Sequence, residues 1–127
     1  MTEENVSQFE KINAQLQSLY EEVGALSKKS QNDPLNKFKL RFINSALSSA
    51  NTLLGDLHKP YADFVQFDEN DLPSNSDAAV MLGQYLSCME KLRADNIIVH
   101  VGQWVWKIDG RPSVIRTTVP DKIRIKK

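Results

Sequence analysis

The spacing of apolar residues changes once along this chain of 127 residues, close to residue 96. Before that point apolar side chains recur every three or four positions, which is the repeat of a helix with one buried face. From Ile97 onward they alternate with polar residues or form short runs bounded by glycine turns, a pattern typical of strands. A chain that is helical first and extended afterwards predicts an α+β fold.

Length and composition favour one globular domain. The 127 residues are within the usual size of a single domain, and 41% hydrophobic with 25% charged residues is ordinary for a folded protein. We therefore expect residues 1–127 to form one domain, with a helical part at about 7–95 and a β part at 97–127. Apolar runs are far shorter than the roughly 20 residues that span a bilayer, so we expect no membrane partner. The acidic, polar start lacks the features of a secretory signal and favours a cytoplasmic protein.

A heptad seam predicts the first helix, at about residues 7–27. Its apolar residues recur at alternating spacings of three and four: Phe9, Ile12, Leu16, Leu19, Val23 and Leu26. The seam covers fewer than three heptads, and few opposite charges flank it, so the pattern does not specify a partner. Packing on the chain's own second helix and a contact between subunits are both compatible with it.

The second helix is predicted to start at Asp33 and Pro34, because Asp is a good N-cap and Pro suits the first helical turn. Gly55 and Pro60 mark its end. Residues 44–52 are mostly Ser and Ala, whose small side chains allow another helix to approach closely. The main apolar stripe is Leu35, Phe38, Phe42, Ala46, Ala50, Leu53 and Leu57, widened by Ile43, Leu47 and Leu54. The first two helices are expected to form an antiparallel hairpin.

A third helix and a sheet are predicted from caps and turns. Ser74 and Asp77 form a capping box that opens a helix ending near Ala94. Strands are expected at 97–101, 104–108 and 113–119, turns at 102–103 and 109–112, and a short additional strand within 121–127. The expected fold is therefore an N-terminal helical hairpin, a third helix, and a C-terminal three-stranded antiparallel β-meander.

Residues that carry catalysis or bind metals are sparse. The two histidines, His58 and His100, form no ligand-spaced pair, and Cys88 is the only cysteine. The five glycines are scattered and form no phosphate-binding loop. The acidic cluster at 68–71 has no identifiable partner ligand elsewhere. We expect a protein that is not an enzyme and that holds no metal or cofactor.

Charge is distributed unevenly, although the chain as a whole is neutral. Residues 96–127 hold seven basic side chains against two acidic ones, a net charge of +5, so the remainder carries −5. Two indoles lie on one face of an expected strand because they are two positions apart. With nearby basic residues they form a candidate surface for an acidic partner: Trp104, Trp106, Arg111, Arg116, Lys122, Arg124 and Lys126. The other interpretation is that both indoles pack against the helices as core.

Residues 79–108 resemble a winged helix-turn-helix, in which a second helix enters the major groove of DNA and a β-wing contacts the backbone. The resemblance places the turn near Gly83, the recognition helix at 84–95 and the wing at 97–108. It implies a DNA-binding regulator whose DNA-facing residues are Gln84, Ser87, Lys91 and Arg93. The same pattern fits one unbroken helix at 75–94 equally well.

These observations favour a non-catalytic interaction or assembly protein. Its helices would mediate oligomerisation or dock a partner, since the seam and the small-residue face both suit contacts between helices. Its basic β part would contact an acidic partner. The expected partner is another protein, a second copy of the chain, or both, and the alternative function is binding of nucleic acid as a winged-helix-like regulator.

Overall fold

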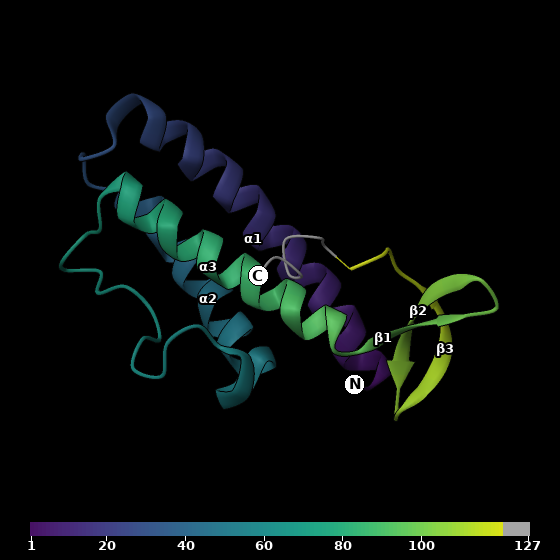
Figure 1. The fold of residues 1–127 in the computed structure, drawn as a ribbon. Coiled ribbons are helices and arrows are strands. Elements are labelled where there is room, and N and C mark those ends of the chain that lie inside the picture. The colour runs from purple at the N-terminus through teal and green to yellow at the C-terminus, as the bar shows by residue number, and fades with distance from the viewer. Residues whose placement is uncertain (121–127) are drawn as a thin grey trace.

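Three helices followed by a three-stranded antiparallel sheet make up the protein, whose computed structural model describes residues 1–120 (Figure 1). The elements are α1 (Glu3–Ser30), α2 (Lys37–His58), α3 (Asn75–Ala94), β1 (Ile97–His100), β2 (Gln103–Ile108) and β3 (Arg111–Arg116). The sheet lies at the end of the helical part where the N-terminus is placed. The α+β fold expected from the sequence is thus confirmed, and within residues 1–120 no helix is long and apolar enough to cross a membrane.

α1 is held by its caps and by its buried seam. The side chains of Thr2 and Asn5 each accept a hydrogen bond from the other's backbone N–H, which closes a capping box at the start of the helix. α1 packs against both α3 and α2. The seam faces this internal contact: Phe9, Ile12, Leu16 and Val23 are buried, and Leu19 and Leu26 pack at the edge of the same core.

α2 starts later than predicted, with Asn36 as its N-cap instead of Asp33. Asp33 and Pro34 belong to a bridge between the two helix starts, in which Pro34 pairs with Ser74. The N–H of Leu35 donates to the Pro73 carbonyl at 2.8 Å, and Leu35 itself is fully buried. Pro34 therefore lies within an extended segment that ties the start of α2 to the start of α3, and the hydrogen bonds of this segment satisfy backbone groups that would otherwise lack partners.

The buried face of α2 also differs from the predicted stripe. Leu40, Ile43, Leu47, Ala50 and Leu54 face the core. Three members of the predicted stripe are exposed instead: Phe38, Phe42 and Leu57, which leave 64%, 54% and 86% of their surface in solvent. Two stripes with helical spacing exist on this helix, and packing against α1 and α3 selects one of them.

The connector between α2 and α3 is fastened to α2 by amide side chains. Asn44 exchanges two hydrogen bonds of 2.9 Å with the backbone of Phe67, and Asn51 donates to the Val65 carbonyl. The Phe64 ring makes edge contacts with the rings of Phe67 and Tyr85. The connector thus covers one side of the helices.

α3 is one continuous helix through Gly83, so of the two arrangements that the sequence allows at 75–94 the structure has the unbroken helix. Gly83 serves a close helix contact: a Cβ at this position would come within 3.3 Å of the Tyr20 ring on α1. The helix opens at Ser74, whose hydroxyl accepts the N–H of Asp77 as predicted. Since the chain has no break near Gly83, residues 75–94 do not form a helix-turn-helix.

The sheet has the order β1-β2-β3, with both pairs antiparallel. The first turn consists of Val101 and Gly102, both with positive φ (51° and 74°), one residue earlier than predicted. This turn sets a register that pairs Ile97 with Trp106. β3 covers residues 111–116 instead of 113–119, and the expected short strand within 121–127 lies outside the described residues.

The sheet and the helices share one core. Trp106 is fully buried and its ring meets that of Phe9 edge-on, with centroids 5.0 Å apart. The N–H of Asp109 donates to the Met1 carbonyl, which holds the second turn against the start of α1. Trp106 and Ile97 therefore complete the hydrophobic cluster formed by the three helices.

Candidate interaction surfaces

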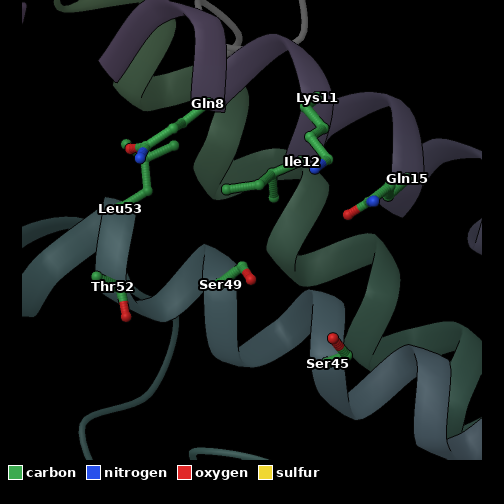
Figure 2. A pocket seen from close by; sticks show the side chains of 8 residues that line it. All are labelled: Gln8, Lys11, Ile12, Gln15, Ser45, Ser49, Thr52 and Leu53. Atoms are coloured by element: carbon green, nitrogen blue, oxygen red, sulfur yellow. The ribbon is translucent and has the colours of Figure 1, made fainter. Parts of the chain in front are cut away.

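A groove runs between α1 and α2, with α3 behind it (Figure 2). Figure 2 shows the side chains of Gln8, Lys11 and Gln15 extending from α1 and the hydroxyls of Ser45 and Ser49 extending from α2. This part encloses about 410 Å³. The short serine side chains keep it open, because a larger residue at either position would fill the space between the helices.

A second, more apolar hollow of about 450 Å³ continues the groove toward the start of α2. It shares Gln15 and Ser45 with the first and is lined further by Ala14, Ser18, Leu19, Phe42 and Ala46. The two hollows form one surface, called here the α1–α2 groove. Its lining combines small and amide side chains with Lys11 and with the apolar side chains of Ile12, Leu19, Phe42 and Leu53.

Two exposed aromatic residues stand at the end of the α1–α2 groove. Phe38 and Phe42 are one helical turn apart on α2, and their rings meet edge-on at 5.0 Å. Each exposes more than half of its surface. Exposed aromatic pairs beside a hollow are typical of contact anchors, since burial of one such ring contributes about 1.5–3 kcal/mol.

The predicted basic β surface is only partly formed by the described residues. Trp106 belongs to the core, and its Nε1 meets no hydrogen-bond acceptor among residues 1–120. Trp104 is half-buried and packs against the core. Arg111 and Arg116 are exposed at the two ends of β3. Lys122, Arg124 and Lys126 lie outside the described residues.

The four predicted DNA-facing residues separate into two groups. Gln84, Ser87 and Lys91 are exposed along one side of α3. Arg93 instead is 8% exposed and binds inside the molecule. Its guanidinium pairs with the Glu90 carboxylate at 2.6 Å and donates to the Thr117 hydroxyl and to the carbonyls of Thr118 and Val119. These bonds fasten the segment after β3 to the end of α3, so this guanidinium is already engaged by four acceptor groups.

Residues 1–120 contain no cluster of three or more His, Cys, Asp or Glu side chains that could hold a metal. His58 Nε2 lies 2.9 Å from Asp95 Oδ2, a contact that joins the ends of α2 and α3. His100 is exposed on β1. Burial raises the pKa of the Cys88 thiol, and the nearby charge of Lys91 offsets only part of this rise. The raised pKa favours the protonated thiol. An activated thiol nucleophile requires the opposite shift.

Sequence reasoning missed Phe38 and Phe42 as surface residues, since it assigned both to the buried stripe of α2. A signal existed, because a second set of aliphatic residues with helical spacing begins at Leu40 on the same helix. A second apolar stripe on one helix, beside the stripe that is buried, indicates a second contact surface. The small residues at 44–52, by contrast, were recognised from the sequence, and two of them line the α1–α2 groove in Figure 2: Ser45 and Ser49.

Comparison with known proteins gives no relationship from which a function could be transferred. No protein-family model matches the chain, and neither a curated protein nor a solved structure shows significant similarity to it.

Proposed function

We propose that this protein is a non-catalytic interaction protein whose α1–α2 groove is its main contact surface. The observation that carries the proposal is the exposed pair of Phe38 and Phe42 beside a groove to which Ala14, Ser18, Ser45 and Ala46 contribute short side chains. Monomeric proteins expose few adjacent aromatic rings, and such rings with a neighbouring hollow mark contact sites.

A second, basic contact surface for an acidic partner is part of the proposal. It rests on Arg111 and Arg116, whose exposed guanidinium groups lie at the two ends of β3. Charges at the rim of an interface mainly accelerate association and contribute to specificity, whereas buried aromatic anchors provide most of the affinity. The aromatic groove is therefore the surface to test first.

Binding of DNA by a winged helix receives less support from the structure. The continuous α3 lacks the turn on which that resemblance depended, and the Arg93 guanidinium is occupied inside the molecule. A protein partner accounts better for exposed aromatic residues, because contacts to DNA are dominated by basic residues that reach phosphates.

The experiment places a photoreactive amino acid at Ser49, in the groove, and in a matched protein at Gln84, on the exposed side of α3. After irradiation in a cell extract we expect a discrete adduct from position 49 and none from position 84. Phe42→Asp should abolish the adduct, since a carboxylate cannot replace the aromatic anchor. Equal labelling from both positions, or an adduct indifferent to Phe42→Asp, would contradict the proposal.

A further inference from the structure

The face that carries the α1–α2 groove contains both a protrusion and a hollow. Phe38 and Phe42 project from the start of α2. Phe42 also forms one wall of the adjoining hollow, and opposite it α1 contributes the short side chains of Ala14 and Ser18. Exposed rings on α2 beside short side chains on α1 allow a self-complementary contact, because a second copy turned to face the first can set its α2 rings over the short side chains of α1.

The charges at the edges of this face are also complementary. Glu22 on α1 forms an ion pair with Lys39 on α2, which places residues 21–22 level with residues 39–41. Successive residues of an α-helix are rotated by about 100° around its axis. Glu21 is therefore rotated by about 100° from Glu22 on α1, and Arg41 by about 200° from Lys39 on α2. Both side chains are exposed. At the level of the Glu22–Lys39 ion pair, α1 therefore carries an acidic residue, Glu21, on its outer edge, and α2 carries a basic residue, Arg41, on its outer edge.

Only one of the two simple ways to place a second copy on this face matches these charges. A two-fold axis parallel to the helices lays α1 of each copy over α2 of the other. Glu21 of one copy then meets Arg41 of the second copy, and the symmetry repeats this contact once more. An axis across the helices lays α1 on α1, and at the level of residue 21 it brings the two Glu21 side chains together. Opposite charges at matched positions favour the first arrangement, and like charges cost free energy in the second.

We propose that the protein forms a homodimer in which two α1–α2 faces pack into a four-helix bundle, with Phe42 of each copy against Ser18 of the other and Phe38 one helical turn further along the same contact. The serines of α2 allow the helices to approach within the 8–10 Å typical of helix packing. This inference rests on the proposed function and names the partner as a second copy of the chain.

Sedimentation equilibrium of the full chain tests the proposal with variants that reverse the charges of Glu21 and Arg41, singly and together. We expect the wild type to reach twice the 14.4 kDa of one chain. Glu21→Arg and Arg41→Glu should each weaken the dimer about tenfold or more, because each places like charges together. The double variant should regain wild-type affinity. Lys91→Glu, an equally exposed charge reversal on α3, is the matched control and should leave dimerisation unchanged.

Circular dichroism of each variant checks that the helices remain folded, and Phe38→Ser provides a second variant that acts on shape instead of charge. A wild type that stays at 14.4 kDa, or a double variant no tighter than the single ones, would overturn the homodimer. The two proposals can fail separately. A monomeric protein that still forms a specific adduct from position 49 with another protein refutes the homodimer alone, whereas a monomer without any adduct refutes both.

Discussion

The Arg93 side chain makes several polar contacts inside the molecule, and these contacts indicate a structural role. Its guanidinium binds Glu90 in a bidentate fashion and fastens residues 117–119 through three further acceptors. Arg93→Leu would remove the donors of these partly buried hydrogen bonds and the partner of the Glu90 carboxylate. We expect the free energy of unfolding to fall by roughly 2–4 kcal/mol, the usual cost of breaking a buried charged contact.

Urea unfolding measures this loss, and Lys91→Leu is the matched control, since Lys91 is exposed two positions earlier on α3. The control should change stability by no more than about 0.5 kcal/mol, as is usual for surface positions. Equal effects of the two substitutions would mean that the contacts of Arg93 add nothing to stability, and its side chain would again be a candidate for binding phosphate.

At the scale of elements, α2 and α3 are joined by a buried hydroxyl whose titration limits stability at high pH. Tyr85 donates to Asn51 at 2.7 Å, and burial raises the pKa of the Tyr85 hydroxyl above its ordinary value of 10.0 despite that bond. Above pH 10 the unfolded chain releases this proton before the folded one does. Stability is therefore fully present below that pH and decreases as the pH rises through the folded-state pKa.

The measurement is the free energy of unfolding in urea between pH 8 and pH 11. Tyr85→Phe should be less stable than wild type by about 1 kcal/mol at neutral pH, because Asn51 loses its donor, yet should lose less stability as the pH rises. Tyr61→Phe changes a tyrosine that is 45% exposed and should retain the wild-type slope. A Tyr85→Phe slope equal to wild type would assign the alkaline loss to other groups. The half-buried Cys88 thiol, whose pKa is also raised by burial, contributes with the same sign above its ordinary value of 9.0.

The order and type of the elements could be predicted from the sequence because each has a local signal. The seam at Phe9 and Leu16 predicted α1, the Ser74 cap predicted the start of α3, and glycines marked both turns. The first turn was misplaced by one residue, since local rules favour glycine in the left-handed position but do not forbid Val101 there. The register is decided by tertiary packing, which directs Trp106 toward Phe9.

The candidate site was harder to predict because it depends on how helices are oriented. On α2 the stripe of Phe38 and Phe42 and the stripe of Leu40 and Ile43 have equivalent spacing. Only the packing of three helices decides that the aliphatic stripe is buried. The groove likewise depends on the distance and orientation of two helices. The small residues at 44–52 could therefore indicate that another helix approaches closely, but they could not show where the groove lies.

At the scale of the whole molecule, the sheet and the helices should unfold as one unit. Trp106 fills the space beside Phe9, and the second turn is bonded to Met1, so the sheet completes the core at that end of α1. Neither part keeps its buried surface without the other. We expect the helix signal at 222 nm and the tryptophan fluorescence to report a single transition in urea, as two-state unfolding requires.

Trp104→Phe sharpens the measurement, because it leaves Trp106 at the junction as the only indole. In that background Phe9→Ala should lower the free energy of unfolding by about 3–5 kcal/mol and shift both signals together, since the cavity weakens a core common to both parts. Tyr20→Ala, at a 39% exposed position on the same helix, is the control for truncation of an aromatic ring and should cost clearly less. If the fluorescence transition moved while the helix signal stayed in place, the sheet would be a separate folding unit attached to an independent helical core.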